Sequence, residues 1–297
     1  MASAKSSWRA AELGKAGEVE VTGGRLRYYE AGAGPPIVFA HGLLVNANLW
    51  RKVVARLSPD FRCIALDVPL GSHSVPLPDA DLTAPGVANL ISDAIEGLGL
   101  EDVTLVGNDT GGGLCQIAVT RRPERIGRLV LTSCDAFDNF PPPFFKYVLA
   151  PARLPGAHIA FGALRLRRAR RLPIAFGWLT HEPIDPQAED SYVYPCLTDG
   201  AIRADLRRVL KGIRPEYMVE AAERLKDFDR PTLVAWGTED RFCPPEHAER
   251  LAATIPDARL EWLEGSYTFT PEERPEQLAE LIAGFVREPR AERTAAR

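Results

Sequence analysis

Val103-Thr-Leu-Val-Gly-Asn-Asp-Thr-Gly-Gly112 is an apolar, β-rich run that ends in a glycine-rich turn and leads into a helical stretch. The turn has the form Gly-x-nucleophile-x-Gly, with Asp109 in the central position. In such a turn the central residue is strained, and the flanking residues must be small because the strand and the helix pass close together. We therefore expect Asp109 at the carboxyl end of a sheet, beside backbone N–H groups that stabilise negative charge.

Apolar runs and helical stretches alternate on both sides of this turn. This rhythm predicts an α/β fold with a mostly parallel, buried sheet flanked by helices. A hairpin is expected at residues 18–22 and 25–31, because Gly23-Gly24 separates two short alternating runs. The remaining strands are expected at 36–40, 61–66, 103–107, 126–132, 231–236 and 259–263, and the helices at 49–57, 84–98, 112–121, 245–255 and 276–286.

The alternation breaks over residues 138–229, which contain several helical segments and no clear strand. We expect this segment to be a helical lid inserted between strands 6 and 7. The basic run Arg165–Arg171 within it is typical of a solvated helical face rather than of a binding site for an acidic group. The predicted organisation is thus a core of residues 17–137 and 230–287, a lid of residues 138–229, and tails at 1–16 and 288–297.

Composition narrows the class of partner. The 297 residues are 45% hydrophobic and 26% charged, with a net charge of −4, so no basic surface is expected to hold nucleic acid or an anionic membrane. A small-molecule substrate is the expected partner. Five scattered cysteines without metal-ligand spacing predict reduced thiols and neither metal nor cofactor. The absence of a signal-peptide core and of a membrane-length apolar run predicts a cytoplasmic protein. The oligomeric state is left open.

Two further segments belong with the turn at Asp109. His41-Gly42 follows the predicted strand at 36–40, and the next residue, Leu43, offers its backbone N–H alongside that of Thr110. Asp240 comes just after the predicted strand at 231–236. The carboxyl ends of parallel strands meet at one edge of a sheet, so these residues are expected to lie together.

These motifs resemble the α/β-hydrolase superfamily, in the branch of epoxide hydrolases and haloalkane dehalogenases, over roughly residues 17–287. The resemblance implies that Asp109 attacks an sp³ carbon to give an alkyl ester. Leu43 and Thr110 would form the oxyanion hole, and Asp240 would be the acid of a catalytic triad. A carboxylate suits this role because it attacks in its ordinary ionised state.

The sequence departs from this pattern in the loop after the last strand, residues 263–275. The position expected to hold the triad histidine is assigned to Tyr267, which is a poor base because the reference pKa of tyrosine is about 10. Two routes therefore stay open. Asp109 forms an ester whose hydrolysis lacks its usual base, or Asp109 activates water directly.

Leaving-group chemistry separates the members of the branch. A dehalogenase holds the halide with side-chain N–H donors, and the corresponding positions here are Thr110 and Leu43. An epoxide hydrolase protonates the opening oxygen with lid tyrosines, for which Tyr192 and Tyr194 are the first candidates, ahead of Tyr147 and Tyr217.

Several polar residues remain beside these candidates. His41 and His73 are candidates to contact the substrate, although His41 is more typical of a structural residue of its loop. Asp135 and Asp138 follow the strand at 126–132 and are interpreted as lid-hinge residues.

The leading functional hypothesis is an enzyme that opens an epoxide on an apolar small molecule through Asp109. Two alternatives stay open: a catalytically silent homologue that binds a ligand under its lid, and a haloalkane dehalogenase.

Overall fold

Strands form one sheet in the order β1-β2-β4-β3-β5-β6-β7-β8 in a computed structural model, which describes residues 2–145 and 162–289. β1 and β2 make an antiparallel hairpin, β2 pairs antiparallel with β4, and the other neighbours are parallel. The bounds are β1 Lys15–Val21, β2 Gly24–Ala31, β3 Pro36–Ala40, β4 Arg62–Leu66, β5 Val103–Asp109, β6 Ile126–Cys134, β7 Thr232–Gly237 and β8 Ala258–Leu263.

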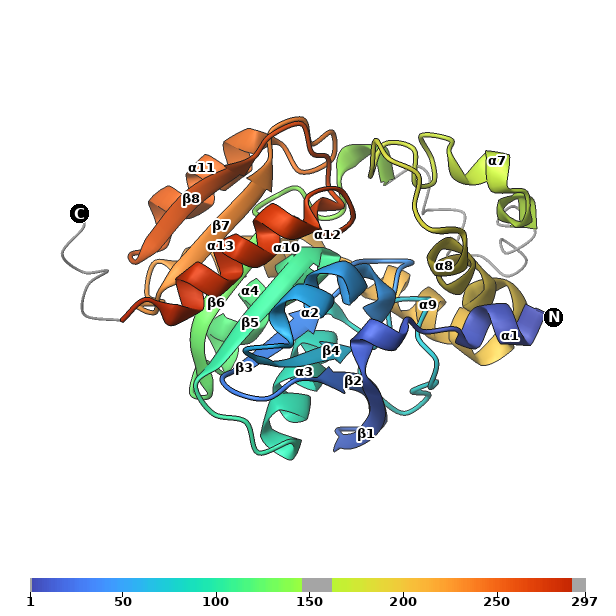
Figure 1. Cartoon of the computed structure of the whole chain (residues 1–297), viewed down its shortest axis with the longest axis horizontal. Helices are drawn as coiled ribbons and strands as arrows, with labels where there is room; N and C mark the ends of the chain where they lie inside the picture. The colour runs from blue at the N-terminus through green and yellow to red at the C-terminus, as the bar shows by residue number, and fades with distance from the viewer. Residues whose placement is uncertain (1, 146–161, 290–297) are drawn as a thin grey trace.

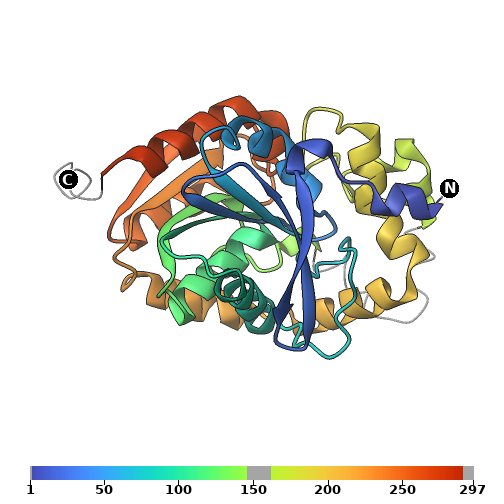
Figure 2. The same ribbon diagram turned by 60° about the horizontal axis from the view of Figure 1, so that its bottom comes forward.

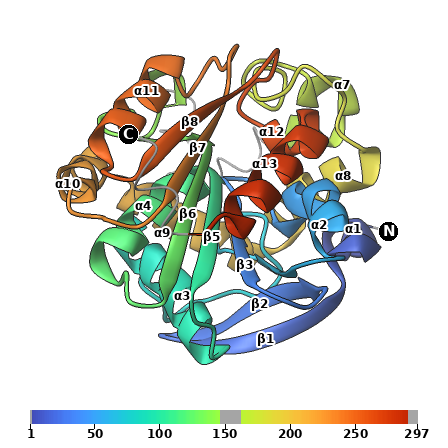
Figure 3. The same cartoon turned by 60° about the vertical axis from the view of Figure 1, so that its left-hand side comes forward.

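Helices cover both faces of this sheet, as Figure 3 shows. On one face α2 (Arg51–Leu57) packs against α13 (Pro275–Arg287). On the other face α3 (Ala84–Gly97) packs against α4 (Thr110–Arg121), and α11 (Pro245–Thr254) covers β7 and β8. The short helices η2 (Ala47–Trp50) and α12 (Thr270–Glu273) precede α2 and α13.

The burial of the central strands confirms the predicted fold class. β5 and β7 are buried along almost their whole length, as expected for strands with helices on both faces. α4 is buried over its first ten residues, which begin with Thr110 and three glycines. The predicted elements all recur, with ends that differ by a few residues at most.

The segment between β6 and β7 contains several helices, and no strand, among the residues that the structure describes. It contains η4 (Gly162–Arg165), α7 (Arg167–Arg170), α8 (Pro186–Thr198), α9 (Gly200–Gly212) and α10 (Pro215–Leu225). Figure 1 shows α7, α8 and α9 gathered at one end of the sheet, whereas α10 packs against α4. The division into a core domain and a lid domain stays a prediction.

The basic run Arg165–Arg171 is only partly solvated. The Arg170 side chain is 1% exposed, and its Nη1 lies 3.1 Å from Glu189 and 2.8 Å from Asp190 on α8. The prediction of a solvated face is therefore wrong for Arg170, because acidic residues of the same chain neutralise it.

The first residues were predicted to be a tail, but in the structure they pack onto the rest of the chain. α1 (Ala2–Ser7) lies against α8, and η1 (Ala11–Leu13) follows it (Figure 2). Between them Arg9 pairs with Asp67 in the loop after β4. Over the described ranges, 2–145 and 162–289, no helix has the length and apolar character needed to cross a membrane.

Candidate active site

Asp109 is the residue that joins β5 to α4, with φ of 54° and ψ of −133°. Residues other than glycine rarely adopt these backbone angles, and such strain often marks a functional residue. The glycines around it allow the close passage of strand and helix. A Cβ on Gly107 would lie 2.5 Å from Cα of Gly112, and one on Gly111 would lie 2.4 Å from the carbonyl oxygen of Ala40.

Backbone amides from two loops hold the Asp109 carboxylate. The amide of Leu43 donates to Oδ2 of Asp109 at 3.2 Å, and the amide of Thr110 also contributes a hydrogen bond. A Cβ on Gly42 would lie 2.0 Å from the same Oδ2, so this approach requires glycine. The two predicted oxyanion donors therefore lie beside Asp109, where they stabilise negative charge.

His41 and His73 do not line the pocket at Asp109. His41 is fully buried: its Nε2 accepts from the amide of Val68 at 3.0 Å, and its Nδ1 donates to the carbonyl of Gly42 at 2.9 Å. Burial lowers the pKa of His41 to about 4, so the imidazole is neutral. The predicted contact of His41 with the substrate is not found. Its hydrogen bonds fit the alternative, a structural residue of the loop.

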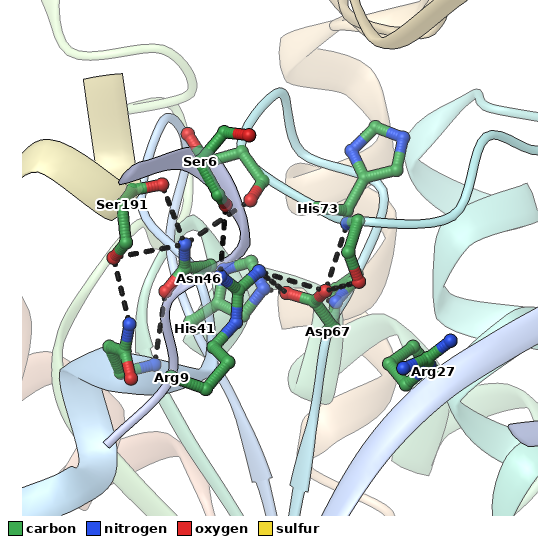
Figure 4. Close-up of polar contacts among 12 residues, drawn as sticks. Ser6, Arg9, Arg27, His41, Asn46, Asp67, His73 and Ser191 are labelled. Carbon is green, nitrogen blue, oxygen red and sulfur yellow. Dashed lines mark hydrogen bonds and ion pairs between the residues drawn. The ribbon is translucent and has the colours of Figure 1, made fainter. Parts of the chain in front are cut away.

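His73 is held in a comparable way, in the part of the molecule drawn in Figure 4. Its Nδ1 accepts from the amide of Gly71 at 3.3 Å, and its Nε2 lies 3.2 Å from Oδ2 of Asp205 on α9. His73 therefore ties the loop after β4 to the inserted helices instead of contacting a substrate.

Asp240 follows β7, as predicted. Its Oδ1 accepts hydrogen bonds from the amides of Phe242 and Cys243, both at 2.9 Å, and from Oγ1 of Thr268 at 2.7 Å. Its Oδ2 is buried and has no hydrogen-bond partner among the described residues. Burial raises the pKa of Asp240 to about 6, in spite of these hydrogen bonds.

In this loop, the side chain that contacts Asp240 is that of Thr268, not that of Tyr267. The Tyr267 ring lies 3.7 Å from the ring of His181, centroid to centroid, and the Arg241 guanidinium lies over it at 4.8 Å. The side chain of Asn108 donates to the carbonyl of Thr268 at 2.8 Å and so holds Thr268 in place beside Asp240. Adjacent residues of the loop point to different sides, so the sequence assignment was one residue off.

Asp135 was interpreted as a hinge residue, yet it lies in the pocket beside Asp109. It follows β6, and its amide donates to the carbonyl oxygen of Asp109 at 3.3 Å. Its Oδ2 accepts from the hydroxyl of Thr110 at 3.0 Å, while its Oδ1 is buried without a partner in the described chain. The sequence held the signal for this neighbour, because β5 and β6 are adjacent parallel strands, β5 ends at Asp109, and β6 ends one residue before Asp135.

Three buried carboxyl groups thus influence one another. Burial, and after it the charge of Asp240, raises the pKa of Asp109 to about 7, although the amides of Leu43 and Thr110 act to lower it. Burial and the charge of Asp109 hold the pKa of Asp135 well above its usual range. Within residues 2–145 and 162–289, none of the three forms an ion pair with a cationic side chain. Near neutral pH the group must therefore retain a proton.

The pocket above Asp109 and Asp135 is mostly apolar. It contains about 880 Å³ of empty space, its open mouth included. Leu43 and Thr110 line its floor, and side chains of the inserted segment and its approach line its walls. Among these wall residues are Phe140, Phe145, Leu164, Phe176 and Leu179. An apolar cavity with a few polar groups at its base is typical of a small-molecule site.

The described lid tyrosines do not offer a hydroxyl to this pocket. The ring of Tyr192 lines it, but the hydroxyl donates to Oε1 of Glu272 at 3.2 Å, and Arg51 pairs with the same carboxylate. Tyr194, predicted to bind substrate, instead lies beneath the Lys5 ammonium, 5.1 Å from its ring centroid. Tyr217 is not among the pocket residues, and Tyr147 lies outside the described residues.

The described residues include no group of three or more His, Cys, Asp or Glu side chains able to hold a metal ion. The five cysteines are all buried and unpaired.

Comparison with known proteins places this geometry in a family. The alpha/beta hydrolase fold family matches residues 35–275. The uncharacterized hydrolase YugF of Bacillus subtilis is 28% identical over 88% of this chain and 94% of its own length. A haloalkane dehalogenase of Agrobacterium fabrum is 27% identical over 92% of this chain and 91% of its own. The crystal structure of carboxylesterase CesB (YbfK) from Bacillus subtilis has the same fold, with a TM-score of 0.75 at 22% identity over 96% of this chain and 94% of that one. The chain therefore belongs to the α/β-hydrolase superfamily.

Proposed function

We propose that this hydrolase opens an epoxide on an apolar small molecule, with Asp109 as the group that starts the reaction. The observation that carries the proposal is the Asp109 carboxyl at the floor of an apolar pocket, held by backbone amides and without a cationic partner in the described chain. A carboxylate needs no activation by a second base, unlike a serine hydroxyl.

The surroundings of Asp240 favour a direct attack by water, with Asp109 as general base. An ester on Asp109 would need a base to activate the water that hydrolyses it, and the side chains that interact with Asp240 are the hydroxyls of Thr268 and Ser133. A threonine hydroxyl donates and accepts hydrogen bonds but takes up no proton near neutral pH. By contrast, a carboxyl with a pKa of about 7 is well matched to accept a proton there.

Haloalkane dehalogenation is the second candidate, since a dehalogenase is among the relatives. A departing halide needs N–H donors, yet the described pocket lining contains no tryptophan or asparagine side chain. Epoxide opening needs a proton donor instead of N–H groups that bind a halide. A pocket whose polar side chains include carboxyls meets this need.

The test is product analysis over a panel of alkyl and aryl epoxides and haloalkanes, with Asp109→Asn as the inactive variant. The matched control is Asp138→Asn, because Asp138 is exposed in the loop that contains Asp135. We expect diol from at least one epoxide, a loss of roughly 10²- to 10⁴-fold in Asp109→Asn, and wild-type rates in Asp138→Asn. Halide release without diol would favour the dehalogenase, and binding without any product would favour the silent ligand-binding homologue.

A single turnover with excess enzyme in ¹⁸O-water separates the two routes. Direct attack puts the label into the diol and none into the protein. An ester intermediate, hydrolysed at its carbonyl carbon, puts the label into the Asp109 carboxylate and an unlabelled oxygen into the diol. A stable mass increase that requires Asp109 would show an ester that the protein fails to hydrolyse.

A further inference from the structure

Opening an epoxide requires a proton for the oxygen that leaves the carbon, and the described tyrosines do not supply one. The Tyr192 hydroxyl donates to Glu272, and Tyr194 and Tyr217 do not line the pocket. A base at Asp109 alone would leave an alkoxide. A proton donor has to be sought among the other polar groups of the pocket.

Asp135 is the polar group best placed for this task. It is 1% exposed, and it lines the same pocket as Asp109. The Thr110 hydroxyl occupies its Oδ2, and the side chain of Gln116 donates to its backbone carbonyl at 2.8 Å, so the residue is held in place. Its Oδ1 has no partner among the described residues. A buried polar atom without a partner calls for an explanation, and the neutral, protonated carboxyl is less costly there than the charged one.

The charges around Asp135 favour its protonated form. The groups that face it are the carboxyls of Asp109 and Asp240 and the thiols of Cys134 and Cys243. Burial raises the pKa of both thiols well above the usual value, so they are neutral and provide no counter-charge. Two buried carboxyls side by side cannot both ionise at low cost, so one keeps its proton.

We propose that Asp135 is the general acid of the reaction and delivers its carboxyl proton to the epoxide oxygen. The water oxygen bonds to one epoxide carbon while the bond from that carbon to the epoxide oxygen breaks. The water gives one proton to Asp109, and the leaving oxygen receives the proton of Asp135. The product is a diol, no group is oxidised or reduced, and the proton on Asp109 returns to Asp135 through the pocket. This inference rests on the proposed function.

The first test is Asp135→Asn, which keeps the acceptor for Thr110 and the size of the side chain but cannot deliver a proton. We expect diol formation to fall by roughly 10²- to 10⁴-fold. The wild-type profile of kcat/KM against pH should decline at high pH, where Asp135 loses its proton. The residual activity of the variant should lack this decline. Asp138→Asn serves again as the control, which should keep both the wild-type rate and the decline at high pH.

Chemical rescue and infrared spectroscopy distinguish a proton donor from a structural residue. In buffer acidic enough to keep it protonated, formic acid should restore part of the activity of Asp135→Ala by filling the vacated space, and it should not restore Asp109→Ala. At a pH above the pKa of Asp109, a protonated carboxyl C=O band should persist in the wild type and disappear in Asp135→Asn.

The outcomes separate the two proposals. Diol formation in the wild type, together with near-normal rates and an unchanged pH profile in Asp135→Asn, would overturn the role of Asp135 and leave the proposed function standing. Absence of the infrared band from the wild type, at a pH above the pKa of Asp109, would also overturn it. If no epoxide gives a diol with the wild type, both proposals fail.

Discussion

Two buried carboxyl sites lie at the same edge of the sheet and differ in their partners. Asp67 follows β4 and accepts from Nη2 of Arg9 at 3.1 and 3.3 Å, and from the amide and hydroxyl of Ser74 at 2.9 and 2.6 Å (Figure 4). Burial raises its pKa, but Arg9 and the other partners outweigh burial, so the net pKa is lowered. Asp135 is as buried as Asp67, whereas Asp109 is partly exposed in the pocket, and the described chain provides no cation for either of them.

This difference teaches how one fold separates a structural aspartate from a reactive one. A paired carboxylate stays ionised, fixes the loops around it and has little remaining capacity to exchange protons. An unpaired carboxyl in an apolar pocket has a raised pKa, which is costly for stability but useful for acid–base chemistry. The predictions below test the two sites from the largest expected effect to the smallest.

Arg9→Met removes the cation of the paired site and should destabilise the protein by about 3 to 5 kcal/mol, because Asp67 is left charged and buried. The folded pKa of Asp67 lies below its ordinary 3.8, so the stabilisation is present above that pH and is lost as pH falls. Urea unfolding near neutral pH and in acid measures this. The control is Arg25→Met, an arginine with a 60% exposed side chain, which should cost less than about 1 kcal/mol. Equal losses in the two variants would contradict the comparison.

Asp109→Asn, at the unpaired site, should stabilise the protein, whereas Arg9→Met destabilises it. The folded pKa of Asp109 is raised from 3.8 to about 7, so stability falls as pH rises through this range, and the substitution removes that cost. At roughly 1.4 kcal/mol per pKa unit, the variant should be more stable than the wild type by about 2 to 4 kcal/mol near pH 8, and by little near pH 4. Thermal unfolding at both pH values measures the gain. A variant that is less stable at high pH would show that Asp109 is a paired carboxylate.

Tyr192→Phe should have the smallest effect on turnover. It removes a hydroxyl that donates to Glu272, so about 1 kcal/mol of stability should be lost. Diol formation should stay within about threefold of the wild-type rate. General acid catalysis, which typically raises a rate by about 10²-fold or more, is assigned to Asp135. A loss of a hundredfold in kcat would return the acid role to the lid tyrosine.

Much of the fold and part of the site followed from local pattern. The alternation of apolar runs predicted the parallel sheet, and the glycines around Asp109 predicted the tight turn from β5 to α4. His41-Gly42 placed Leu43 beside Asp109 for the same reason, since a glycine is needed at that contact. These features depend on residues close in sequence and on steric limits that any chain obeys, so the sequence by itself determined them.

Tertiary structure decided what each polar side chain faces. The choice between Tyr267 and Thr268 beside Asp240 depends on how one loop is anchored by Asn108, and the pairing of Arg9 with Asp67 joins residues 58 positions apart. Asp135 has no cationic partner in the described structure, a fact that no local pattern records. The pKa of a buried carboxyl depends on every group packed around it, and that packing exists only in the folded chain.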